Sequence, residues 1–313
     1  MENTKGSESA ESLLKEAQAL KETDTSRSER LAQEAVIKAR ESGAWQIAGE
    51  ALLVMAYCRY RCGMFVDMAS VASEALALFE ARSDEFRAAK AHHFLGMANI
   101  YLSNYSEALS HLQHALATFE ALGDSHWKAQ SLNNFGHVYC LLTDYTSAVE
   151  VMQKSVAILQ SLGKHYESAA ALNNLANVYA TLGDYNRALD YYRQSLVIFS
   201  EVGNRHFESN ALLNIGDVLL IQGNRAGGLE ALQKGLSVKR EIRDVFGEAR
   251  ALASLGEAVL LSEHNESAER LLKSALMLYQ QIGNRQGEAS VALKLGKVHQ
   301  RRFNQDGSLN EKH

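Results

Sequence analysis

The sequence predicts an all-α fold, a right-handed superhelical solenoid of tandem antiparallel helix pairs. Glycines recur forty residues apart at Gly123, Gly163 and Gly203, and Gly283 stands two further periods along the chain. Between them, apolar residues recur in steps of three and four, which marks one face of an α-helix. Helix formers are abundant, and the chain contains no proline to interrupt them. Self-similarity at a fixed period without gaps is the signature of a solenoid.

The repeated unit is clearest over residues 172–199, where it predicts two helices joined by a tight turn. Gly183 allows the first helix to end with a positive φ, and Asp184 is a good N-cap for the second. Each helix then has one apolar face to bury. The first face consists of Leu172, Leu175, Ala176, Tyr179 and Leu182, and the second of Tyr185, Ala188, Leu189, Tyr192, Leu196 and Phe199.

This unit resembles the tetratricopeptide repeat. Its residues fall where that family has Leu-Gly, Tyr, Ala, an aromatic and a small residue, namely at Leu175, Ala176, Tyr179, Ala188, Tyr192 and Ser195. The forty-residue length is similar to that of LGN/Pins-type scaffolds, kinesin light chains and bacterial signalling arrays. The resemblance is strong over residues 43–302 and weak over 8–42. It departs from the family in lacking the proline that usually ends the second helix.

The chain divides into segments in the following order. We expect a flexible N-terminus over residues 1–7, a degenerate N-terminal helix pair over 8–42, six hairpins over 43–282, a C-terminal capping helix over 283–302 and a flexible tail over 303–313. The degenerate pair keeps the spacing but lacks the glycine and the tyrosine, as terminal repeats often do. The alternative to a capping helix, that the chain is cut from a longer protein, stays open.

Composition and motifs argue against several classes of function. The net charge of −5 argues against a general nucleic-acid binder, and three cysteines give no disulfide framework. No apolar run is long enough for a membrane span, and we expect a cytoplasmic protein. His111, His114 and Glu107 have a spacing that can hold a metal, but we expect both histidines to face solvent. Cys58 and Cys62 read as small core residues. We therefore predict no metal, no cofactor and no catalytic site, because no nucleotide-binding, metalloprotease or hydrolase motif is present.

The resemblance implies that the first helix of each pair lines a concave groove. At about 100° per residue, a row of side chains lies opposite the core face of each first helix. We predict that this row binds a partner protein or peptide segment. Its candidate residues are Tyr57, Phe94, Met97, Tyr101, Asn134, His137, Asn173, Asn174, Asn177, Asn210, Asn214 and Asp217.

Two features single out this row. Asparagine is a poor residue for a helix interior, yet it clusters there, and its amide can pair with the main chain of an extended peptide. Large apolar groups such as Phe94 and Tyr101 on a helix face that should be exposed to solvent indicate a contact surface. Two alternatives stay open: the asparagines bridge adjacent helices, or the chain's own N-terminal segment covers the aromatic patch.

The sequence therefore predicts a non-enzymatic scaffold for protein–protein interaction. One alternative is the sensory region of a larger bacterial signalling protein, such as a nucleotide cyclase or a transcription regulator. Another is a receptor for a signalling peptide, as the resemblance to Rap-type regulators implies. Self-association stays open.

Overall fold

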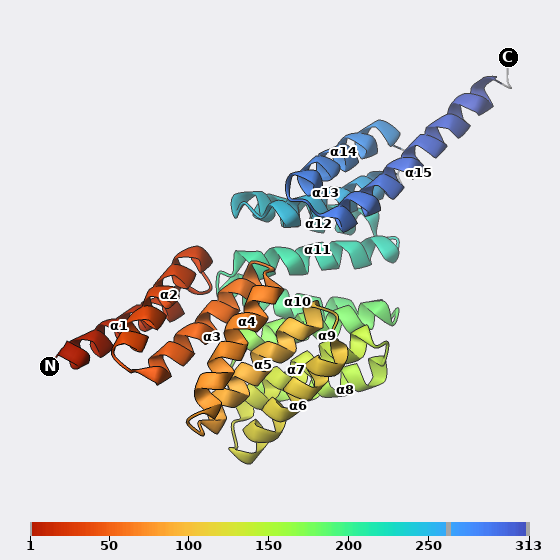
Figure 1. The fold of residues 1–313 in the computed structure, drawn as a ribbon. Coiled ribbons are helices and arrows are strands. Elements are labelled where there is room, and N and C mark those ends of the chain that lie inside the picture. The colour runs from red at the N-terminus through yellow and green to blue at the C-terminus, as the bar shows by residue number, and fades with distance from the viewer. Residues whose placement is uncertain (1, 261–263, 311–313) are drawn as a thin grey trace. The chain divides into compact units, whose positions relative to one another are not determined.

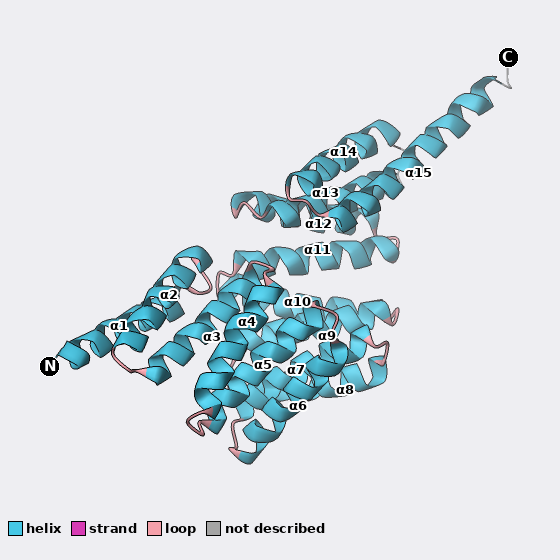
Figure 2. Ribbon diagram, in the orientation of Figure 1, coloured by secondary structure: helices cyan, strands magenta, loops and turns pink. Residues whose placement is uncertain are grey.

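The structure is a computed structural model that describes residues 2–260 and 264–310, with side chains from residue 9 to 301 and that of Phe303. Within these ranges it contains helices and short connections and no strand (Figures 1 and 2). The chain forms two compact units, Met1–Gly163 (unit 1) and Lys164–His313 (unit 2). The all-α array of helix pairs predicted from the period is confirmed.

Unit 1 holds four helix pairs and unit 2 holds three pairs and a last helix. Odd-numbered helices are the first helices of a pair and even-numbered ones the second. Unit 1 contains α1 (Glu2–Leu20), α2 (Thr25–Glu41), α3 (Trp45–Arg61), α4 (Phe65–Glu80), α5 (Glu85–Tyr101), α6 (Tyr105–Ala121), α7 (Ser125–Leu141) and α8 (Tyr145–Ser161). Unit 2 contains α9 (His165–Thr181), α10 (Tyr185–Glu201), α11 (Arg205–Ile221), α12 (Arg225–Glu241), α13 (Val245–Leu260), α14 (Asn265–Gln281) and α15 (Arg285–Asn310).

From Gly43 onward, the described connections between helices keep one backbone conformation. Gly183 has φ +78°, and its N–H donates to the carbonyl of Ala180, while Asp184 accepts from the N–H of Arg187 and begins α10. Arg243 stands where the period expects a glycine, yet it keeps the same left-handed region at φ +56°, as Ser83 does at φ +54°. The turn therefore persists without glycine because the packing of the flanking helices imposes it.

The core of each pair depends on small residues in the first helix. A Cβ on Gly96 would lie 2.6 Å from Leu112, and one on Gly136 would lie 2.4 Å from Met152. The second helix therefore approaches the first closely at these points. Large side chains of the second helices, such as Phe79, Phe119 and Phe199, are also fully buried.

Both ends of the chain differ from the expected segments. Helix α1 begins at Glu2, so residues 2–7 are helical where the sequence predicts a flexible segment. Helix α15 continues through Asn310, past the predicted end of the capping helix at residue 302, and so includes most of the predicted flexible tail. Phe303 stands where other pairs have the turn residues Gly183 or Gly223, and the helix continues through it. Residues 311–313 lie outside the described residues.

Candidate functional site

The predicted row of polar residues in unit 2 forms a hydrogen-bonded network between neighbouring first helices. Asn214 of α11 places its Nδ2 atom 3.5 Å from Asn173 Oδ1 and 3.4 Å from Asn177 Oδ1, both on α9. The Tyr192 hydroxyl of α10 donates to the same Asn177 oxygen over 2.5 Å. The predicted alternative that asparagines bridge adjacent helices is thus confirmed for Asn173, Asn177 and Asn214.

Arg250 extends this network to α13. Its guanidinium donates to Asn214 Oδ1 and lies 3.6 Å from the Asp217 carboxylate. Burial raises the pKa of Asp217, and the positive charge of Arg250 opposes that rise. The cation therefore links the amides of α9 and α11 to the predicted acidic residue of the row.

The remaining candidates of unit 2 occupy the margins of the network. Asn210 Nδ2 lies 3.4 Å from His206 Nε2 on the same helix. Asn174 is half-buried on α9, beside Asn173. Sequence reasoning missed Tyr192, since it belongs to the core face of a second helix and only its hydroxyl reaches the row.

Asn177 is the exposed member of this network. Its carbonyl oxygen accepts from two neighbours, so the amide is held in one orientation. No hydrogen bond within the described part of the chain uses its Nδ2 group. A fixed amide with two available N–H donors can bind a main-chain carbonyl without selecting a side chain.

In unit 1, the row contains an aromatic cluster. The rings of Tyr101 and Phe65 stack with centroids 4.3 Å apart, and Tyr60 and His137 contact Tyr101 at 5.6 and 5.8 Å. Tyr101 is 40% exposed. Burial raises the pKa of the Tyr101 hydroxyl and lowers that of His137, so both side chains are neutral at pH 7. Two of the candidates, Tyr101 and His137, thus lie in contact, and Tyr60 and Phe65 join them from α3 and the start of α4.

The segment after α1 covers Tyr57, a candidate whose ring lies 6.3 Å from that of Tyr60 in this cluster. The Tyr57 hydroxyl donates to Glu22 over 2.6 Å, and the Lys21 ammonium lies 5.0 Å from the centre of the Tyr57 ring. Arg61 also binds Glu22, at 2.9 Å. Coverage by the N-terminal segment, one of the two alternatives, is therefore correct for Tyr57.

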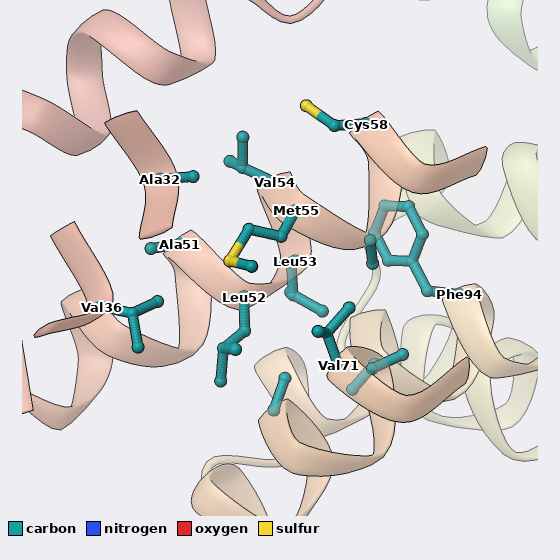
Figure 3. Close-up of a cluster of buried hydrophobic side chains, with 14 of the residues drawn as sticks. Ala32, Val36, Ala51, Leu52, Leu53, Val54, Met55, Cys58, Val71 and Phe94 are labelled. Atoms are coloured by element: carbon teal, nitrogen blue, oxygen red, sulfur yellow. The ribbon is translucent and has the colours of Figure 1, made fainter. Parts of the chain in front are cut away.

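The prediction that Phe94 lies on a wet surface is wrong. Phe94 is only 8% exposed and belongs to the core of unit 1, where Figure 3 shows it among the labelled apolar side chains. Trp127 of the next first helix contacts the Phe94 ring edge to face, at 6.4 Å. Met97 also packs against this core. At Phe94 the row therefore faces the neighbouring first helix, α7, and Trp127 of that helix shields the Phe94 ring from solvent.

Asn134 likewise makes an internal contact. Its Nδ2 group lies 3.3 Å from Nε2 of the buried His93, whose Nδ1 atom lies 3.2 Å from the Ser131 hydroxyl. Burial, together with nearby His126, lowers the pKa of His93 to about 3. Asn134 therefore provides a hydrogen-bond partner for a buried, neutral histidine, and this amide group is not directed towards solvent.

Histidine, cysteine and carboxylate side chains are the other candidate ligands among the described residues. Among them, no group of three or more His, Cys, Asp or Glu side chains can hold a metal. His111 does not simply face solvent as expected, since its Nδ1 atom lies 2.8 Å from Nδ1 of His92. Cys58, Cys62 and Cys140 are free thiols. No helix in the described ranges is long and apolar enough to cross a membrane.

The hairpins match a known family. A family model of the tetratricopeptide repeat matches residues 86–161 and, in an overlapping second match, 127–201. Residues 86–201 therefore belong to the tetratricopeptide repeat family. No curated protein matches it.

Solved structures of tetratricopeptide proteins share this fold. A signal transduction ATPase with numerous domains from Pyrococcus horikoshii, which has a tetratricopeptide repeat sensor, is 16% identical with a TM-score of 0.67. The likeness covers 97% of this chain but 49% of that one, so the chain spans about half of its length. A Rap protein complexed with competence and sporulation factor is 16% identical, with a TM-score of 0.62 and coverage of 96% and 99%. A putative kinesin light chain from Podosopora anserina is 17% identical, with a TM-score of 0.51 and coverage of 63% and 96%.

Proposed function

We propose that this chain is a non-enzymatic scaffold that holds an extended segment of a partner protein along the first helices of unit 2. Asn177 donates its Nδ2 hydrogens to a main-chain carbonyl of that segment. The exposed amide of Asn177, fixed through its oxygen by Tyr192 and Asn214, is the observation that carries the proposal. A cytoplasmic location and self-association stay predictions.

A preorganised donor binds more tightly than a mobile one. A free asparagine side chain loses rotamer entropy when it binds a ligand, whereas the Asn177 amide is already oriented by two hydrogen bonds. A backbone contact also tolerates many side chains in the ligand. The Rap protein, which shares the fold, was solved with a bound factor, and this supports a ligand-binding role for such an array.

The substitution Asn177→Asp tests this role. It keeps the oxygen that accepts from Tyr192 and Asn214 but replaces the Nδ2 donor with a second acceptor. Truncation to alanine is less informative, because it would leave the buried Tyr192 hydroxyl without its partner. We therefore expect Asn177→Asp to preserve stability and to weaken peptide binding by about 1–3 kcal/mol.

The probes are peptides selected from a random library on the immobilised chain, with affinities measured by calorimetry. Asn186→Asp is the matched control, since Asn186 is an exposed asparagine at the start of α10 and lies outside the row. We expect that variant to bind like the parent. Selected peptides that bind Asn177→Asp and the parent equally would refute the proposal.

A second function, the sensor region of a larger signalling protein, has one supporting observation. The Pyrococcus ATPase that carries a tetratricopeptide sensor aligns with 97% of this chain over about half its own length. In that case the row of unit 2 would bind the signal. The same peptide-binding test applies, and a reading frame that encodes an ATPase or another output domain beside these repeats would favour the sensor.

A further inference from the structure

His206 connects a residue of the predicted row to the ion pair between Lys239 and Asp244. Its Nδ1 atom lies 3.3 Å from the Asp244 carboxylate, in the connection between α12 and α13. On the other side of the ring, Nε2 lies 3.4 Å from Nδ2 of Asn210, one turn further along α11. The proposed partner segment lies along this helix, so the orientation of Asn210 affects which groups the row offers to it.

Asp244 determines which nitrogen of a neutral His206 ring carries the proton. The carboxylate also accepts from the Lys239 ammonium over 2.6 Å and from the N–H of Gly247 over 2.8 Å. Partial burial opposes the ionisation of Asp244, but its hydrogen bonds lower its pKa, so the carboxylate is charged and can only accept. Neutral His206 can donate to it only as the tautomer with the proton on Nδ1, and Nε2 is then an acceptor.

An acceptor at Nε2 fixes the Asn210 amide in one orientation. Only the NH2 group of this amide can donate to Nε2, so Oδ1 remains available as an acceptor. No hydrogen bond within the described residues uses this oxygen, and Asn210 is half-buried. Asn177 has the opposite arrangement, because its oxygen is bound and its Nδ2 group is available. The row therefore offers a fixed donor on α9 and a fixed acceptor on α11.

We propose that His206 orients Asn210 so that its Oδ1 atom accepts a main-chain N–H group of the bound partner segment. This inference rests on the proposed function, in which Asn177 binds a carbonyl of the same segment. The two amides then match both kinds of polar group that an extended main chain carries. The contact selects no side chain, but it excludes proline at one position of the segment, because proline has no N–H group. His206 is a positioning residue, since it acts on the segment through Asn210.

The first test requires no ligand. Nitrogen-15 NMR of the imidazole ring in the full chain distinguishes the two neutral tautomers of His206 at about pH 8, where histidine is ordinarily neutral. We expect the proton on Nδ1. A proton on Nε2 would overturn the proposal, because Nε2 could then no longer accept from Asn210, and it would leave the proposed role of Asn177 unaffected.

The second test uses peptides selected from a random library on the immobilised chain, with each residue N-methylated in turn. N-methylation removes one main-chain N–H group, so we expect one position at which it weakens binding to the parent by about tenfold. In His206→Leu the Asn210 amide is no longer oriented, and the same N-methylation should have a much smaller effect. His206→Gln should behave like the parent, because its amide can donate to Asp244 and accept from Asn210.

Urea denaturation of both variants shows whether they fold like the parent. N-methyl effects that are the same in the parent and in His206→Leu at every peptide position would overturn the proposal. Asn177→Asp would still weaken binding of the same peptides in that case, so failure of this inference is distinct from failure of the proposed function.

Discussion

Gly136 leaves no room for a side chain, whereas Gly296, in the same register, is open. Glycine in a helix interior costs about 1 kcal/mol relative to alanine, so close packing must offset that cost where glycine is buried. Met152 provides that packing at Gly136. The two glycines form a matched pair in which the same substitution has opposite consequences.

We expect Gly136→Leu to lower the free energy of unfolding by about 1–3 kcal/mol, because the added side chain overpacks the contact with Met152. Gly296→Leu should leave it unchanged or raise it by up to about 1 kcal/mol, since leucine is the better helix former. Urea denaturation of both variants measures the difference. Equal stability of the two would show that first and second helices are not closely packed at Gly136.

His93 makes unit 1 sensitive to acid. Its pKa falls from 6.5 to about 3 in the folded chain, mainly because it is buried. Below pH 6.5 the unfolded chain therefore binds a proton that the folded chain does not, and the free energy of unfolding falls as the pH falls towards 3. One such histidine contributes a slope of up to about 1.4 kcal/mol per pH unit.

The substitution His93→Leu should reduce this slope, because leucine has no titratable group. The variant should still fold, because leucine occupies the corresponding buried positions Leu53 and Leu213. The remaining slope comes from other histidines with lowered pKa values, His92, His111 and His137. Urea midpoints between pH 4 and 7 measure the change. An unaltered pH dependence in the variant would mean that His93 titrates normally in the folded chain.

At the scale of the helix pair, Lys239 departs from the repeat. It occupies the position of Phe79, Phe119 and Phe199 and is only 1% exposed. Its ammonium lies 2.6 Å from the Asp244 carboxylate, which also accepts from the N–H of Gly247 and lies 3.3 Å from His206 Nδ1. These donors lower the pKa of Asp244 despite its partial burial, so the carboxylate stays charged.

A buried ion pair of this kind contributes little net stability but is costly to break. Asp244→Asn keeps the acceptor for Gly247 and removes the charge, so it should lower the free energy of unfolding by about 3 kcal/mol. Lys239→Met should cost less than Asp244→Asn, because the Asp244 carboxylate that it leaves is 18% exposed and keeps the N–H of Gly247 as a donor. Thermal and urea unfolding of both variants check this, and a larger loss in Lys239→Met than in Asp244→Asn would contradict it.

At the scale of the whole molecule, the forty-residue period predicted the helix pairs well because each pair packs mainly on its neighbours. Local signals then fix each boundary, as Gly183 and Asp184 do between α9 and α10. The period failed at the last helix, where Phe303 replaces the turn residue and the helix continues.

The site was harder to predict for a physical reason. The angle of a residue around a helix separates the face that packs on the second helix from the opposite face, but that opposite face meets both solvent and the next first helix. Asn177 lies where this face meets solvent, whereas Phe94 lies where the Trp127 ring covers the face. Contacts such as Tyr192 with Asn177 and Tyr57 with Glu22 depend on how far each side chain reaches, which one helix alone does not specify.

The central claim is that the fixed amide of Asn177 binds the backbone of a partner segment. A double-mutant cycle tests it most directly, with amide-to-ester substitutions along a selected peptide measured against the parent chain and Asn177→Asp. An ester carbonyl is a weaker acceptor, so the substitution at the contacted carbonyl should weaken binding to the parent and have a much smaller effect on the variant. Ester effects that are the same in both proteins at every peptide position would contradict the claim.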